Sequence, residues 1–428
     1  MLLGERKMTC ILKNSTRLFL ILSIALNGMA AFADSGCTQI SSTDNPPLPL
    51  GSNIIPISFG TSPYPNPPVN QPLVSVTICV PGTGHCLTID HLLLDTGSHG
   101  LRIFKSLITI PLPPVNDPVN VGAGYTESEC VGYLAGAQQW GAVVRADVIM
   151  GGETANNVNM QEIDASYPSG IPPGSDCATK AVAFPSDSSY NGVVGVGFLA
   201  NDCGTGCTSS RATNYYKCSG NSPCVPTAVR PSYQVQNLIS KMNEGFNNGV
   251  SITLPPIGYC GRSGLTGYLT LGVGTRQNNT PPVTTNVLSA DPIDLTIRTT
   301  FEGQQYTGYI DSGTNTFNFS PIGRAAAELT DCGSTSEAPG FFCPTDNPKY
   351  SATMQSYWGG PLVPVTFQIV NALSLIGSNN TAFSTLGSGG GTVGDFDWGI
   401  SFFFGKTVYV VQKDKSAPGL GVGPIWAF

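Results

Sequence analysis

Two short segments, DTGS at 95–98 and DSGT at 311–314, repeat one pattern in the two halves of the chain. They lie 216 residues apart, each after an extended apolar segment. Each is followed, further along its half, by a second apolar segment that contains glycine, at 193–195 and at 398–399. One such tetrapeptide arises easily by chance, but two with matched flanks predict an internal duplication. We therefore expect two lobes of similar design, each presenting one aspartate.

Paired aspartates can carry out hydrolysis without a metal or a nucleophilic side chain. Attack on a peptide bond needs a water that loses a proton and a carbonyl oxygen that gains one, and two carboxyl groups sharing a proton supply both. Like charges a few ångströms apart cannot both ionise, so one pKa rises and the other falls. The alternative interpretation is that both segments are structural turns of a two-lobed β protein.

The residues beside the two aspartates fit the catalytic interpretation. A glycine two positions after each aspartate lets the backbone turn tightly and approach a carboxylate closely. Thr96 and Ser312 offer hydroxyls that could join the two loops, and Ser98 and Thr314 could donate to the outer carboxylate oxygens. The candidate catalytic residues are Asp95 and Asp311, and the supporting residues are Thr96, Gly97, Ser98, Ser312, Gly313 and Thr314.

The N-terminal residues have the pattern of a cleaved secretory signal. Four basic residues lie within 1–17, an apolar run follows at 18–26, and small residues stand at 31–33. The run is shorter than the roughly 20 residues of a spanning helix. Cys37 lacks the preceding apolar residue typical of a lipid-modified cysteine. We predict a signal peptide at 1–33, a leader loop at 34–50, no transmembrane anchor, and a secreted or periplasmic protein.

Composition limits the class of protein and its partners. Without residues 1–33 the chain has 16 basic and 26 acidic residues, so nucleic acid is not an expected partner. Only 11% of the residues are charged, and Gly and Pro together number 85 of 428. These values favour short strands and many turns over helices. We expect a mainly β chain with few short helices, and the repeated segments divide it into lobes at 51–262 and 263–428.

The cysteines predict disulfides. Removal of the signal peptide takes Cys10 and leaves 12 of the 13 cysteines, an even number in an oxidising compartment. Local pairs are expected where two cysteines flank a turn, namely Cys79 with Cys86 and Cys332 with Cys343. Four more crowd one region: Cys203, Cys207, Cys218 and Cys224. Their spacing matches no standard zinc finger, so disulfides are favoured over a zinc site, and neither a metal nor a cofactor is expected.

Apolar alternation and turn residues predict the main elements. Strands are expected at 53–60, 73–80, 86–94, 140–152, 191–198, 299–310 and 396–412, with the phenylalanines at 402–404 in the core of a lobe. The segment 233–245 is the best helix candidate of the first half, ending at Gly245. A short helix is expected after Pro321.

The quoted segments resemble those of the bilobal pepsin-like aspartic peptidases over most of the chain. LLLDTGSHGLRIF is similar to the first catalytic segment of that family and YIDSGTNTFNFS to the second, while NGVVGVGF and WGISFFFGKTVYVV resemble its apolar-glycine segments. The resemblance implies an aspartic endopeptidase in which Asp95 and Asp311 activate a water. It also implies a monomer of two β-barrel-like lobes, with a polypeptide substrate in the central cleft between them.

A more specific resemblance is to secreted bacterial proteins known as a domain of unknown function. The marks of that family include DTGS-x-GLR, WG followed by ADV, DCG-xx-C, YY-x-C and DWG-[IL]-x-FF-x-G. They stand here at 95–102, 140–148, 203–207 (with its aspartate at 202), 215–218 and 397–405.

The sequence departs from pepsins at several positions. The possible flap tyrosine is Tyr133, with Tyr125 as a competitor. Asp397 stands where an apolar residue is usual, and it is interpreted either as a loop cap or as a third acid. Residues 34–101 contain no Lys or Arg, so self-inhibition by a basic segment is not expected.

Other polar residues receive simpler interpretations. His99 is too near Asp95 and Ser98 in sequence to form a triad with them. Arg102 and Arg145 are interpreted as solvated or paired charges. The alternative function is a bilobal envelope protein that binds a peptide or polysaccharide without cleaving it, and a third interpretation is a purely structural surface protein.

Overall fold

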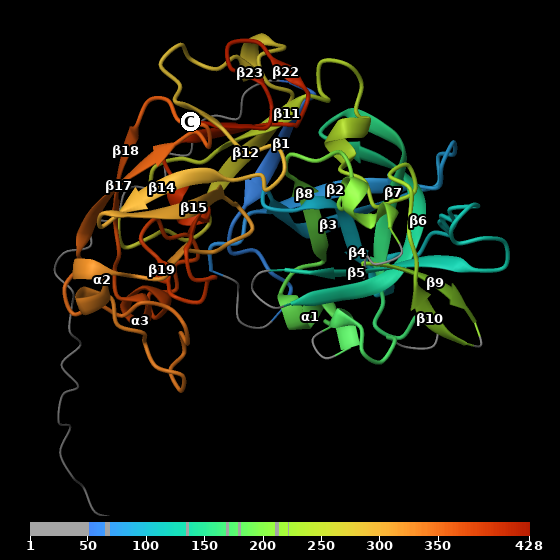
Figure 1. Ribbon diagram of the computed structural model, residues 1–428, viewed down its shortest axis with the longest axis horizontal. Helices are drawn as coiled ribbons and strands as arrows, with labels where there is room; N and C mark the ends of the chain where they lie inside the picture. The colour runs from blue at the N-terminus through green and yellow to red at the C-terminus, as the bar shows by residue number, and fades with distance from the viewer. Residues whose placement is uncertain are drawn as a thin grey trace, which may run out of the picture. The chain divides into compact units, whose positions relative to one another are not determined.

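The computed structural model describes residues 51–64, 69–133, 137–167, 171–178, 181–209, 214–220 and 222–428. The predicted signal peptide (1–33) and leader loop (34–50) lie outside the described residues. Strands dominate the described chain, and both large sheets belong to one compact unit (Figure 1). Among the described residues, no helix combines the length and apolar composition that a membrane crossing requires.

The larger sheet contains strands from residues 54–289 and from residues 407–427. In spatial order its strands are β10 (Ser222–Pro226), β9 (Tyr215–Ser219), β5 (Thr126–Gly132), β6 (Gln138–Met150), β7 (Glu153–Ile163), β4 (His99–Phe104), β8 (Gly192–Val196), β3 (Cys86–Asp95), β2 (Leu73–Cys79), β1 (Ile54–Ser58), β12 (Thr266–Leu271), β11 (Gly249–Thr253), β21 (Thr407–Val411), β24 (Ile425–Ala427) and β13 (Val287–Ser289). Because the long strand β6 pairs with both β7 and β2, the strands between them close into a barrel-like ring.

The second sheet is built from residues 297–398. In spatial order its strands are β18 (Val363–Gln368), β17 (Lys349–Gln355), β14 (Ile297–Phe301), β15 (Gln304–Ile310), β20 (Asp395–Trp398), β16 (Phe317–Phe319) and β19 (Gly387–Ser388). A small ribbon pairs β22 (Ser416–Ala417) with β23 (Gly421–Val422). The strands of this sheet lie beside those of the larger sheet in Figure 1. The predicted boundary at 262/263 stays a prediction.

Helices are few and short in the described chain. The α-helices are α1 (Pro185–Ser188), α2 (Gly323–Glu328) and α3 (Ala372–Ile376). The 3-10 turns are η1 (Lys105–Leu107), η2 (Asp176–Ala178), η3 (Gly204–Thr208), η4 (Leu238–Lys241), η5 (Gln277–Asn279) and η6 (Ile400–Phe402). The prediction of a mainly β chain with few short helices is confirmed.

The two aspartate segments occupy equivalent places in the two sheets. Strand β3 enters the first segment, pairs in parallel with β8, and β4 then leaves antiparallel to β8. Strand β15 enters the second segment, pairs in parallel with β20, and β16 leaves antiparallel to β20. The duplication seen in the sequence is therefore also a duplication of topology, and it presents each aspartate at the end of a buried strand.

The interiors of the two sheets differ in composition. The core beneath β2, β3 and β8 is mostly Val, Ile and Leu, whereas the second sheet covers a cluster of aromatic rings. Within that cluster, Phe319 stacks on Phe396 at 4.5 Å between ring centroids, and Trp398 stacks on Phe396 at 4.4 Å. The phenylalanines at 402–404 are buried, as predicted. Aromatic packing of this kind holds β20 rigidly beneath the second aspartate segment.

The helix predicted at 233–245 is wrong. Only the four-residue turn η4 forms there, after Asn237, whose side chain accepts from the backbone N–H of Ile239. Gln234 and Asn237 are buried and donate to backbone carbonyls of other segments, at Gly204 and Gly197. These polar side chains satisfy backbone carbonyl groups in loops of the lobe. Tertiary contacts therefore override the local helical pattern.

Disulfides connect the described cysteines largely as predicted. The two local pairs, Cys79–Cys86 and Cys332–Cys343, are confirmed. The crowded group forms disulfides, as favoured, between Cys203 and Cys207 and between Cys218 and Cys224. The spacing did not predict Cys130–Cys177, which joins residues 47 apart. Disulfides in this number are typical of proteins from an oxidising compartment.

Candidate active site

The two aspartate segments are joined by reciprocal hydrogen bonds between buried hydroxyls and backbone groups. The Thr96 N–H donates to Ser312 Oγ at 3.1 Å, and the Ser312 N–H donates to Thr96 Oγ1 at 2.9 Å. Thr96 Oγ1 donates in turn to the Ile310 carbonyl at 3.0 Å, and Ser312 Oγ to the Leu94 carbonyl at 2.7 Å. Each loop thus completes the hydrogen bonding of the other, which fixes the separation of the two aspartates.

Glycine is required where the carboxyl groups meet. A Cβ atom on Gly97 would lie 2.5 Å from Cγ of Asp311, and one on Gly313 would lie 2.6 Å from Oδ1 of Asp95. Each glycine therefore makes room for the aspartate of the opposite loop. The Gly97 N–H donates to Oδ1 of Asp95 at 2.8 Å and to Oδ1 of Asp311 at 3.1 Å. One backbone N–H thus contacts the inner oxygens of both carboxyl groups.

The outer carboxyl oxygens bond to the hydroxyls that the sequence singled out. Ser98 Oγ donates to Oδ2 of Asp95. Thr314 Oγ1 lies 2.9 Å from Oδ2 of Asp311 and 2.8 Å from Oδ2 of Asp397. Since one hydroxyl carries one proton, it can donate to only one of these two carboxyl groups, so the other must itself hold a proton to complete the pair of hydrogen bonds.

Burial and mutual repulsion keep protons on this group of acids. Burial, followed by the charges of Asp95 and Asp397, raises the pKa of Asp311 well above its usual range. Burial, together with the charges of Asp95 and Asp395, raises the pKa of Asp397 to about 7, although its hydrogen bond with Thr314 acts in the opposite direction. The site therefore retains a transferable proton in acidic and near-neutral solution.

Two cavities adjoin the paired aspartates. The first, of about 150 Å³, is lined by Gly97 and Asp311 from the two loops and by Asp397. The second, of about 430 Å³, extends along the second loop from Gly313 and also reaches Asp397. His99 lines the first cavity, but burial and the Arg102 charge lower its pKa to about 3, so it is neutral at pH 4 and above. The candidate acid–base groups of the first cavity are therefore its aspartates.

Of the two candidate flap tyrosines, Tyr133 packs against the buried cluster that includes Leu93, on the strand that ends at Asp95. It follows β5 at the end of the β5–β6 hairpin, where its N–H donates to the Ala137 carbonyl at 2.9 Å, and its hydroxyl donates to Gln139 Oε1 at 3.0 Å. Burial raises the pKa of Tyr133, although the Arg102 charge acts in the opposite direction. Tyr125 precedes β5 and is exposed. A flap role for Tyr133 stays a proposal.

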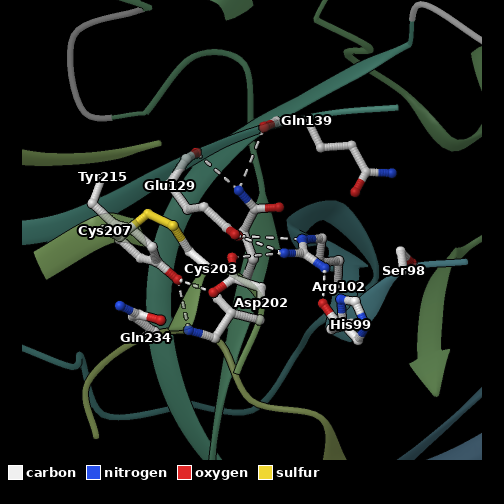
Figure 2. Close-up of polar contacts among 12 residues, drawn as sticks. Ser98, His99, Arg102, Glu129, Gln139, Asp202, Cys203, Cys207, Tyr215 and Gln234 are labelled. Atoms are coloured by element: carbon white, nitrogen blue, oxygen red, sulfur yellow. Dashed lines mark hydrogen bonds and ion pairs between the residues drawn. A yellow bond between two sulfur atoms is a disulfide. The ribbon is translucent and has the colours of Figure 1, made fainter. Parts of the chain in front are cut away.

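A buried ion cluster supports the first aspartate loop from behind (Figure 2). Arg102 on β4 is fully buried, and its Nη2 lies 2.6 Å from Glu129 Oε1 and 3.1 Å from Asp202 Oδ2. Its Nη1 donates to the His99 carbonyl at 2.7 Å. The hydroxyl of Tyr215 donates to Asp202 Oδ1 at 2.8 Å. Arg102 therefore links the loop that carries Asp95 to β5 and β9.

This cluster explains several of the motifs quoted from the sequence. Arg102 ends the GLR motif, Asp202 begins the DCG motif beside the Cys203–Cys207 disulfide, and Tyr215 opens the YY motif. One cation faces two carboxyl groups, and burial together with the Glu129 charge raises the pKa of Asp202 well above its usual range. Of the two interpretations of Arg102, a solvated charge or a paired one, the second is confirmed, and the pair is buried. Arg145 instead donates to the neutral Asn159.

Stability is expected to fall as pH rises, and Glu127 is one measurable cause. Burial raises the pKa of Glu127 on β5 to about 8 from its ordinary 4.5, and its Oε1 has no partner among the described residues. The folded chain therefore holds a proton that the unfolded chain releases above pH 4.5. The resulting stabilisation is complete below that value and is lost as pH rises to about 8.

Glu127→Gln tests this expectation, because glutamine keeps the shape without the titration. The variant should gain stability relative to the wild type between pH 4.5 and pH 8 by more than about 1.4 kcal/mol, the value of one pKa unit. Urea unfolding at the two pH values measures the difference. The exposed Glu337→Gln should follow the wild type, and identical pH slopes for all three proteins would contradict the assignment.

The fold repeats one loop-and-strand unit, β3–β4–β8 in the first half and β15–β16–β20 in the second, and brings their aspartates together. The described chain is mainly β, with barrel-like sheets and short helices. Among solved structures it is similar to the aspartic proteinase from Irpex lacteus, with 14% sequence identity and a TM-score of 0.45 over 87% of this chain and 96% of that one. No sequence among the curated proteins matches the chain.

A protein family described as "Protein of unknown function (DUF3443)" matches residues 49–428. The match spans both aspartate loops, the Arg102 cluster and the C-terminal strands, and it agrees with the resemblance inferred from the motifs. The chain belongs to this family, DUF3443.

Proposed function

We propose that the protein is a pepsin-like aspartic endopeptidase that acts outside the cytoplasm. The observation that carries the proposal is the contact of one N–H, that of Gly97, with the inner oxygens of Asp95 and Asp311. The reciprocal bonds of Thr96 and Ser312 keep the two carboxyl groups in this arrangement. A pair held in this way can bind one water between its members, which two independent structural turns would not need.

The mechanism follows from the unequal proton affinities of the pair. Asp311, whose pKa is raised by burial and by its acidic neighbours, holds the proton, and Asp95 is the base. Asp95 takes a proton from the bound water, whose oxygen forms a bond to the scissile carbon, while Asp311 protonates the carbonyl oxygen. The proton held by Asp95 then passes to the leaving nitrogen as the C–N bond breaks, and Asp311 takes back a proton from one hydroxyl of the tetrahedral intermediate, which yields a carboxyl group and an amine. Each aspartate therefore acts once as an acid or base in each step.

Export from the cytoplasm is part of the proposal. The basic and apolar pattern of residues 1–33 and the disulfides of the described chain both support it. A polypeptide substrate would lie in the cavities beside the two loops, and the unit would act as a monomer.

Incubation of purified residues 34–428 with a mixed peptide library from pH 3 to 7 tests the proposal, with Asp311→Asn purified in parallel as a blank. We expect internal cleavage, mapped by mass spectrometry of the products, that is greatest on the acidic side. A peptide with a secondary alcohol in place of the scissile amide should inhibit, because it resembles the tetrahedral intermediate. A chelator and a serine-directed reagent should not inhibit.

Two results would contradict the proposal. Equal cleavage by the blank would assign the activity to another site or to a contaminant. Binding of library peptides without cleavage would favour the alternative of a bilobal binding protein.

A further inference from the structure

The larger cavity beside the second aspartate loop has an acidic lining without a counter-charge. Its volume is about 430 Å³, and Asp395 and Asp397 are the charged residues among the described residues that line it. We propose that this cavity binds the cationic side chain of a lysine or arginine of the substrate, next to the bond that Asp95 and Asp311 hydrolyse. The inference rests on the proposed function and gives it a substrate class.

Two buried oxygens in the cavity lack a hydrogen-bond donor. Asp397 is 5% exposed, its Oδ2 contacts Thr314, and its Oδ1 has no partner among the described residues. Asn318 Oδ1 is likewise buried without a partner. The two residues lie directly opposite each other on the antiparallel strands β20 and β16, so their side chains share one face of the sheet. Both oxygens therefore need a donor that the described chain does not supply.

Ammonium and guanidinium groups fit this need better than any neutral side chain. Each carries several N–H donors and no acceptor, and each brings the positive charge that the cavity lacks. Neither Asp395 nor Asp397 forms an ion pair with a described Lys, Arg or His. An apolar side chain would leave the two oxygens buried and unpaired, which is the strongest basis for rejecting a ligand.

The walls of the cavity suit a long basic side chain. Phe341 offers an apolar surface along which the methylene groups of lysine or arginine can pack. A Cβ atom on Gly390, which also lines the cavity, would meet nothing within 4 Å, so the space beside this residue is open. Thr314 contacts Asp311 and Asp397 alike, which places the cavity one side chain away from the reacting acids.

The preference for a cation is expected to grow with pH. Asp397 faces Asp95, Asp311, Asp395 and the Tyr309 hydroxyl. Its burial, followed by the charges of Asp95 and Asp395, raises its pKa to about 7 against the opposing effect of its hydrogen bond with Thr314. Below that value Asp397 holds a proton, which a bound cation must displace. Above pH 7 Asp397 is already ionised, so a lysine side chain gains more binding free energy relative to a neutral side chain.

Matched peptides measure the preference. Lysine is compared with norleucine, and arginine with citrulline, at each of the three positions on either side of a cleaved bond. The wild type gives kcat/KM for each peptide, and the Asp95→Asn variant gives Kd without cleavage. At one position the basic residue should be favoured about 10- to 100-fold, the effect of one hydrogen-bonded charge in a buried site, and the ratio of Kd values should widen from pH 5 to 8.

Variants assign the preference to the cavity. Asp397→Leu and the isosteric Asp397→Asn should each bring the ratio close to one, and thermal melts establish that both fold. The exposed Asp346→Asn, with the same loss of charge outside the cavity, should keep the wild-type ratio. Cleavage without a preference for a basic residue would contradict the cavity assignment but not the peptidase function. A preference that persists in both Asp397 variants would do the same. Selective binding without cleavage supports the cavity assignment and instead contradicts the peptidase.

Discussion

Asp95→Asn and Asp311→Asn are each expected to lower kcat/KM for a cleaved peptide by at least about 10³-fold, the largest effect anticipated for any substitution. Asparagine keeps the hydrogen bonds to the Gly97 N–H and to the neighbouring hydroxyls in similar geometry. It cannot accept or release the proton that the reaction moves. The loss should therefore appear in kcat, whereas the Kd of an uncleaved peptide should change little.

Rapid-quench kinetics at pH 4 and binding by calorimetry separate these two quantities. Asp346→Asn, an exposed change of the same kind, should stay within about twofold of the wild type. Retention of more than a tenth of the wild-type kcat by either aspartate variant would remove that residue from the chemistry. A thermal melt of each variant distinguishes loss of folding from loss of the chemical step.

Arg102→Met is expected to destabilise the folded protein by about 3–5 kcal/mol, because it leaves Glu129 and Asp202 buried without their cation. Glu129 is fully buried. Nη2 of Arg102 lies 2.6 Å from a carboxyl oxygen of Glu129 and 3.1 Å from one of Asp202. Methionine replaces the length of the side chain but none of its hydrogen bonds. The same change frees the His99 carbonyl, so the loop that carries Asp95 should also lose order.

Urea unfolding measures this effect against Arg324→Met. Arg324 is also ion-paired, with Glu302 and Glu328, but it is half exposed, so its replacement should cost about 0–1 kcal/mol. A loss for Arg102→Met no larger than that of Arg324→Met would mean that the two buried acids neutralise themselves without a cation. In that case the loop would not depend on the cluster for support.

The duplicated loops could be predicted because each is specified by residues that are adjacent in the sequence. Four residues and an apolar strand define each loop, and the supporting hydroxyls follow within the same segments. The fold class followed from glycine, proline and the alternation of strands. The helix at 233–245 failed for the opposite reason, since its buried Gln234 and Asn237 bond to backbone far away in sequence.

The Arg102 cluster could not be predicted from local pattern. Its partners lie 27 and 100 residues along the chain, and only the fold shows that they meet. An arginine inside the apolar strand segment GLRIF was the available signal, because a charge on a buried strand needs a partner. Asp397 gave a similar signal as an acid at an apolar position, but its contact with Thr314 required the strand register of β16 and β20.

The joint action of Asp95 and Asp311 is tested most directly by the double variant Asp95→Asn/Asp311→Asn. Two groups that act on one water form a unit, and removal of the second costs nothing further once the first is lost. We predict that kcat/KM of the double variant equals that of either single variant within about threefold. A double variant whose loss is the product of the two single losses would show that the aspartates act independently, and this result would contradict the account.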